Sequence, residues 1–145
     1  MSRSPQDLGL AVKRLQNRHH QALSAALRVL GVSLVQWDAL RHLGLNPEAS
    51  LHDLAQLTFQ TDQAFGTLAG RMVERGLIER VSGPGRAVRH RLTELGEAVR
   101  RDGAEIVGRV AADSFAPLTP AQRDTLGDLL DRLLADGDGP TGAGA

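Results

Sequence analysis

The residues in this sequence best suited to chemistry are arginines that gather in one stretch of the chain. Between residues 75 and 91 there are five arginines and one glutamate, whereas between residues 119 and 138 there are two arginines and five aspartates. The formal net charge is zero, so the average hides this asymmetry. We expect the first stretch to contact a polyanion and the second to avoid one. The arginines of the first stretch are Arg75, Arg80, Arg86, Arg89 and Arg91.

Other reactive side chains form no catalytic or metal-binding pattern. The chain has no cysteine, which excludes disulfides, thiolate metal sites and cysteine redox switches. His19 and His20 are adjacent, and neighbouring side chains on a helix point about 100° apart, so the pair is poorly placed to bind one zinc ion. The sequence contains no Gly-x-Ser-x-Gly, His-Glu-x-x-His or intact phosphate-loop motif. It therefore predicts no enzyme, no metal site and no cofactor.

Length and composition predict one soluble globular domain. The chain has 145 residues, of which 41% are hydrophobic, 23% are charged and only 3% are aromatic, so aliphatic side chains must form the core. No apolar run approaches the roughly 18–20 residues of a membrane span. The N-terminus lacks the pattern of a signal peptide. We expect a cytoplasmic protein without membrane contact.

Hydrophobic periodicity predicts six helices that position these residues. Ser33, Ser50 and Thr119 each begin a capping-box pattern at a helix start. Gly66 and Gly70 lie one turn apart in the fourth helix, which indicates close approach by either a neighbouring helix or a ligand backbone. The predicted helices span residues 7–30, 34–43, 51–58, 61–75, 94–114 and 119–135.

A hairpin follows the fourth helix. The stretches Leu77–Ser82 and Ala87–Leu92 alternate in polarity and are separated by Gly83-Pro84-Gly85. Residues 33–92 thus have the form of a winged helix-turn-helix, in which one helix enters a major groove and the hairpin reaches the adjacent minor groove. The alternative is that these elements form only a core or a protein-binding module.

Several motifs in this region resemble the MarR family of bacterial transcriptional regulators. They are the stretch from Leu54-Ala55-Gln56-Leu57 to Gly76-Leu77-Ile78-Glu79-Arg80, and the hairpin exit Arg91-Leu92-Thr93-Glu94-Leu95-Gly96. The resemblance covers roughly residues 8–135. It implies a mainly α (α+β) fold and a repressor that binds a pseudo-palindromic operator as a homodimer. The competing function is an architectural or protein-interaction module without a specific operator.

The resemblance also implies a domain organisation. Residues 1–32 would form an N-terminal dimerisation helix, 33–92 the DNA-binding domain and 93–136 a linker and C-terminal dimerisation helices. Residues 137–145 have nothing to bury and are expected to be disordered. The terminal helices carry apolar stripes that a small central domain cannot cover, so a partner chain would bury them; packing within one chain is the alternative.

The family pattern assigns DNA contacts to particular positions of this chain. The start of the fourth helix would face the major groove, with Gln63 and Thr67 as the candidates for base edges. Asp62 could accept a hydrogen bond from cytosine N4 or simply stabilise the helix start. The implied major-groove set is Thr61, Asp62, Gln63, Gly66 and Thr67, and the implied backbone contacts are Ser50, His52, Arg71 and Arg75.

The hairpin tip departs from the family pattern. Most members carry an Asp-x-Arg or Asp-Arg-Arg element there, whereas this sequence has Gly83-Pro84-Gly85-Arg86 without an aspartate. Arg86 is the only charge at the tip and is assigned the minor-groove contact. Arg89, on the second strand, is also included among the DNA-binding residues.

Many relatives release DNA when a small aromatic acid binds between the dimerisation helices and the winged helix. On that resemblance, a small aromatic ligand is a candidate partner, with His19, Trp37, Arg41 and His42 as candidate lining residues. For Trp37 the competing interpretation is a core side chain.

Overall fold

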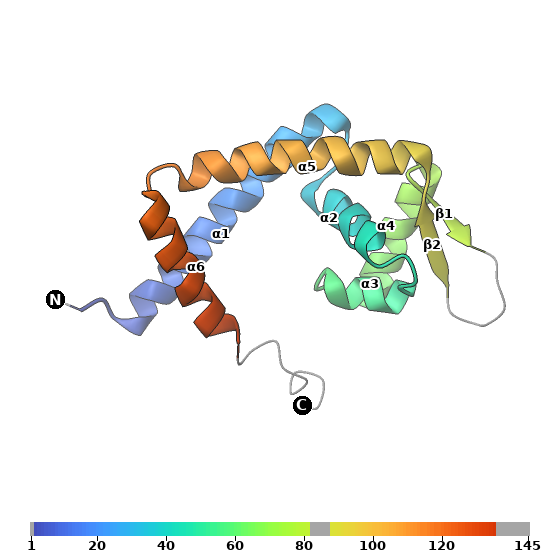
Figure 1. Ribbon diagram of the computed structural model, residues 1–145. Helices are drawn as coiled ribbons and strands as arrows, with labels where there is room; N and C mark the ends of the chain where they lie inside the picture. The colour runs from blue at the N-terminus through green and yellow to red at the C-terminus, as the bar shows by residue number, and fades with distance from the viewer. Residues whose placement is uncertain (1, 82–87, 136–145) are drawn as a thin grey trace. The chain divides into compact units, whose positions relative to one another are not determined.

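The computed structural model describes residues 2–81 and 88–135, which form a mainly helical winged helix-turn-helix (Figure 1). This confirms the predicted fold class. Arg86, the Gly83-Pro84-Gly85 turn and the predicted disordered tail lie outside the described residues. The elements in chain order are α1 (Pro5–Leu27), the 3-10 turn η1 (Arg28–Leu30), α2 (Leu34–Leu45), α3 (Leu51–Leu57), α4 (Asp62–Glu74), β1 (Ile78–Val81), β2 (Arg89–Leu92), α5 (Glu94–Phe115) and α6 (Pro120–Leu134).

The helix boundaries follow the predicted caps with small shifts. Ser33, Ser50 and Thr119 all form capping boxes, as predicted. The first helix ends three residues earlier than predicted, because the chain tightens into η1 before Gly31 turns left-handed at φ 72°. The second helix continues through Gly44 to Leu45, two residues beyond the predicted end.

The strands are shorter than predicted. Leu77 does not join β1, because its N–H completes the end of α4 by donating to the Met72 carbonyl at 3.0 Å, next to Gly76 at φ 74°. β1 and β2 pair antiparallel, with Arg80 opposite His90. A further hydrogen bond, from the Leu51 N–H to the Val88 carbonyl at 3.0 Å, fastens the start of α3 to the hairpin.

Two compact units divide the chain, with the boundary between Val110 and Ala111. The first unit holds the core, in which α2, α3 and α4 pack against one another and against the hairpin (Figure 1). Trp37 is 5% exposed, and its indole N–H donates to the Arg100 carbonyl of α5 at 3.1 Å. The largest of the fully buried side chains in the described residues are those of Leu27, Leu40, Leu54, Met72 and Leu77.

The junction between β2 and α5 is closely built. The hydroxyl of Thr93 donates to the Gly76 carbonyl and accepts the Gly96 N–H at 3.0 Å. Gly96 rests directly on the Leu77 carbonyl, because a Cβ there would lie 1.8 Å from that oxygen. The start of α5 is therefore fixed to the base of the hairpin.

Large apolar side chains remain exposed on both terminal helices within the described residues. The exposed set is Leu8, Leu10, Val12 and Leu15 on α1 and Leu129, Leu130, Leu133 and Leu134 on α6, at 40–73% exposure. No single helix in the described ranges is long and apolar enough to cross a membrane; residues 5–30 and Leu34–Leu45 reach that composition only when taken together across a 78° bend.

Candidate nucleic-acid interface

A short turn holds α3 and α4 in a fixed arrangement. α3 ends at Leu57, and Phe59 then adopts a left-handed conformation at φ 58°. The turn is closed by the Gln60 N–H, which donates to the Ala55 carbonyl at 2.8 Å. Thr61 caps α4 by accepting the Ala64 N–H. The second helix of the motif therefore starts at a defined point, and only four residues separate it from the end of the first.

α4 separates a buried face from an exposed one. Its buried side chains are Phe65, Ala69 and Met72. The predicted groove residues Thr61, Asp62, Gln63 and Thr67 are all exposed, and the Thr67 hydroxyl donates to the Gln63 carbonyl at 3.2 Å. The structure thus brings the predicted base-contacting side chains onto one exposed surface.

The two glycines of α4 do not accommodate another helix. A Cβ added at Gly66 or Gly70 would meet no described protein atom within 4 Å. The neighbouring-helix explanation of their spacing is therefore wrong for the described part of the chain. Approach by a ligand backbone remains a prediction.

A contact between the two helices was not foreseen from the sequence. His52 of α3 lies with its Nδ1 2.8 and 2.9 Å from the two carboxylate oxygens of Asp62 at the start of α4. Both side chains are 61% exposed. The pairing depends on the angle between α3 and α4, which residue spacing does not encode.

The arginines of this region differ in whether their side chains are already paired within the protein. Arg75 donates to the side-chain oxygen of Gln36 at 3.3 Å and so turns toward the start of α2. Arg89 pairs with Glu48 at 2.8 Å, and Arg91 pairs with Glu79. Arg71 is exposed and makes no side-chain hydrogen bond or ion pair within the described ranges.

A hollow of about 370 Å³ lies between α4 and the hairpin. His90, at its wall, is 4% exposed, and its Nδ1 has no hydrogen-bond partner among the described residues. Burial lowers the pKa of His90, and the charge of Arg80 on the opposite strand lowers it further. The histidine is thus held neutral behind α4. The other lining residues are Leu51, Gly66, Ala69, Gly70, Val73, Arg80 and Val88.

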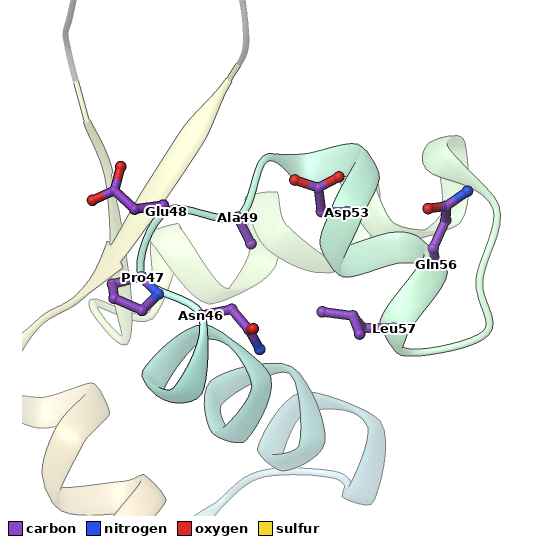
Figure 2. A pocket seen from close by; sticks show the side chains of 7 residues that line it. All are labelled: Asn46, Pro47, Glu48, Ala49, Asp53, Gln56 and Leu57. Carbon is purple, nitrogen blue, oxygen red and sulfur yellow. The ribbon is translucent and has the colours of Figure 1, made fainter. Parts of the chain in front are cut away.

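A second hollow, of about 550 Å³, lies between α3 and the loop that precedes it (Figure 2). Its lining includes the carboxylates of Glu48 and Asp53. Hydrogen bonds from the backbone N–H and hydroxyl of Ser50 lower the pKa of Asp53, so this carboxylate stays charged. Two carboxylates give this hollow the wrong charge for a polyanion.

The candidate ligand residues divide into a core side chain and a polar cluster. Trp37 packs in the core against Gly103, where a Cβ would lie 2.2 Å from its ring. The guanidinium of Arg41 contacts Asp38 and His42, each at 3.1 Å. His19 is half-buried on α1.

Comparison with known proteins gives consistent similarities. Residues 30–87 match the model of the MarR family. The chain is 29% identical over 131 residues to the HTH-type transcriptional repressor Rv2887 of Mycobacterium tuberculosis, covering 89% of this chain and 94% of that one. It is 26% identical over 120 residues to the repressor IacR of Pseudomonas putida, covering 81% and 72% respectively.

Solved structures share the fold. The crystal structure of Rv2887 with salicylic acid has a TM-score of 0.74 at 28% identity and covers 91% of this chain and 98% of that one. A variant of MarR from E. coli, solved with operator DNA, has a TM-score of 0.80 at 22% identity and covers 88% and 94%. The winged helix-turn-helix described above is therefore the fold of these regulators.

Proposed function

Because this chain belongs to the MarR family, we propose that it is a transcriptional repressor that binds a pseudo-palindromic DNA operator as a homodimer. The exposed face of α4 carries the proposal. Thr61, Gln63 and Thr67 project from it, and no described protein atom lies within 4 Å of a Cβ built at Gly66. A helix with such a face fits a major groove, where base edges present distinct donor and acceptor patterns.

In this proposal side chains of α4 contact base edges, and residues near α4 contact the phosphates of the DNA backbone. Gln63 has the donor and acceptor pair that suits adenine N6 and N7, and Thr67 can hydrogen-bond a base or contact a thymine methyl. Arg71, unpaired within the described ranges, is the best placed of the arginines for a phosphate. Ser50 and Arg89 would contact further phosphates of the DNA backbone near Arg71. Arg86 would enter the minor groove.

A second copy of the chain would complete the molecule. The apolar side chains on α1 and α6 are exposed in the single chain, and large exposed apolar patches mark interaction surfaces. Their burial against a partner would place two winged helices on one operator. Such a regulator acts in the bacterial cytoplasm and is not an enzyme.

A small aromatic acid is the proposed effector. The relative Rv2887 has been solved with salicylic acid and with p-aminosalicylic acid. In this chain the candidate polar contacts are Arg41 and His42 on α2, with His19 on α1, whereas Trp37 supports the core. Titration of an operator complex with salicylate tests release directly.

The deciding experiment is selection of genomic fragments by the purified protein at physiological salt, followed by footprinting. We expect one protected pseudo-palindrome whose half-sites lie about one helical turn apart. It should be preferred over random DNA by roughly a thousandfold or more. Diffuse protection without a preferred site would instead support the architectural or protein-interaction function.

Two substitutions separate base reading from backbone contact. Gln63→Ala should relax the preference for one base in each half-site, whereas Arg86→Ala should weaken binding to all sequences by about 1–3 kcal/mol and reduce the salt slope by roughly one. Arg101→Ala, which removes an exposed arginine of α5, is the matched control for lost charge. Wild-type binding by Arg86→Ala would show that the short hairpin does not reach the groove.

A further inference from the structure

We propose that Asp62 reads no base but orients His52 as a phosphate-binding group, and that DNA binding takes up a proton at His52. This inference rests on the proposed function, because it assigns roles within the same surface. It concerns two exposed side chains that join the two helices of the motif. The contact between them determines which nitrogen of the imidazole faces outward.

The geometry fixes the tautomer of the neutral histidine. An ionised carboxylate only accepts hydrogen bonds. Because both oxygens of Asp62 lie within 2.9 Å of Nδ1, that nitrogen must carry the proton. The neutral imidazole then presents a bare Nε2, which is an acceptor. Since the side chain is 61% exposed, Nε2 remains open to a ligand.

A phosphate oxygen is also an acceptor, so it cannot bind the bare Nε2. Protonation of Nε2 makes both ring nitrogens donors, one to Asp62 and one to the phosphate. The imidazolium then lies between two anions and is stabilised by both. A histidine changes charge in the physiological pH range more readily than other side chains, so this step can occur under ordinary conditions.

The charges around His52 agree with this role. On its own helix, Asp53 lies close enough to interact with the histidine charge, and its carboxylate is engaged by Ser50. On α4 the facing group is Asp62. On β2, Arg89 also interacts with the charge of Asp53, and its guanidinium is paired with Glu48.

The same contact explains why Asp62 lies beside a polyanion. A free carboxylate there would repel phosphates. Paired with a protonated histidine, it contributes no net charge to the surface. Both of its oxygens already contact Nδ1, so accepting a hydrogen bond from cytosine would compete with that contact. Asp62 is thus a positioning residue that acts through His52.

Because phosphate contacts do not depend on sequence, a random duplex of about 24 base pairs is a sufficient probe at low salt. Nitrogen-15 spectra of the imidazole rings should show that the single proton of the neutral His52 ring lies on Nδ1 in the free protein, and that DNA binding at the same pH adds a proton to Nε2. His52→Gln assigns the signal. A ring that stays singly protonated in the complex would overturn the inference.

Affinity for the same duplex provides the second measurement. Proton uptake should tighten binding as the pH is lowered, by up to about tenfold per pH unit for each protomer. His52→Gln should flatten this dependence. Asp62→Asn should also reduce it, and should change nothing further in the His52→Gln background. Asp102→Asn, on the exposed side of α5, is the control for removing one carboxylate.

The outcomes separate this inference from the proposed function. An unchanged pH dependence in His52→Gln overturns the proton uptake, even when a specific operator exists. A changed base preference caused by Asp62→Asn in the His52→Gln background makes Asp62 a base-reading residue and overturns its positioning role. If the wild-type protein preferred no operator, the repressor function would be overturned. The imidazole spectra recorded with the random duplex would still decide the inference about His52.

Discussion

Substituting Gly103 by alanine tests how closely α5 packs on the winged helix. A Cβ at this position would lie 2.2 Å from Cδ1 and 2.3 Å from Nε1 of Trp37. Ordinary van der Waals contact begins near 3.4 Å, so the ring and the helix must separate by more than an ångström. That movement breaks the hydrogen bond from the Trp37 indole to the Arg100 carbonyl, which is 3.1 Å long.

The expected loss of stability has three contributions. Overpacking a core costs about 1–3 kcal/mol. A buried indole N–H left without its acceptor costs roughly a further 1–3 kcal/mol. Replacing glycine by alanine inside a helix stabilises the folded state by about 1 kcal/mol, which offsets part of this loss. We therefore expect Gly103→Ala to lower the free energy of unfolding by about 1–5 kcal/mol.

Urea unfolding followed by fluorescence is the appropriate assay, because Trp37 is the only tryptophan of the chain. The matched control is Gly108→Ala on the same helix, where a Cβ meets no described atom within 4 Å. That variant should be as stable as the wild type or more stable, by up to about 1 kcal/mol. If both variants had the same unfolding midpoint, the packing argument for Gly103 would be refuted.

Three more predictions concern the interface and the buried histidine behind it. Glu48→Gln should change the free energy of unfolding by less than about 1 kcal/mol, because the ion pair between Glu48 and Arg89 is exposed. The same substitution frees Arg89, so the slope of log affinity for DNA against log salt concentration should steepen by roughly one. An unchanged slope would show that Arg89 does not contact DNA. Burial lowers the pKa of His90 in the folded protein, so the unfolded chain binds this proton first as the pH decreases. The free energy of unfolding should therefore decrease from about pH 6.5 downward, and this decrease should stop once the pH is below the pKa of His90 in the folded protein. His90→Leu should abolish that part of the loss in acid unfolding curves. Gly66→Ala should stabilise the fold by up to about 1 kcal/mol yet weaken operator binding, and equal binding would mean that the groove does not approach this position.

Local signals in the sequence determined most of the helices. Capping residues such as Ser33 and Thr119 satisfy backbone groups within three residues of themselves, so their effect can be read without the rest of the fold. The shortened β1 has a different origin. Leu77 alternates correctly for a strand, but its N–H is taken by the end of α4, which the strand pattern does not reveal.

The candidate site was only partly predictable for a related reason. The exposed face of α4 follows from helical periodicity, so Gln63 and Thr67 were found together. Pairings between elements were not found. Arg75 contacts Gln36, and His52 contacts Asp62, because of how the helices cross. Such contacts depend on interhelical angles, which a single sequence does not specify.

The contacts at Thr93 join the start of α5 rigidly to the base of the hairpin. With the glycine backbone seated on the Leu77 carbonyl, the joint has no side chain to yield, so a tilt of the helix is passed to the strands. The close packing of Trp37 on Gly103 and its hydrogen bond to the Arg100 carbonyl also hold this part of α5 to α2, so the hairpin, α2 and the first half of α5 are expected to move together. A ligand that displaced this part of α5 would therefore also displace the hairpin without touching it.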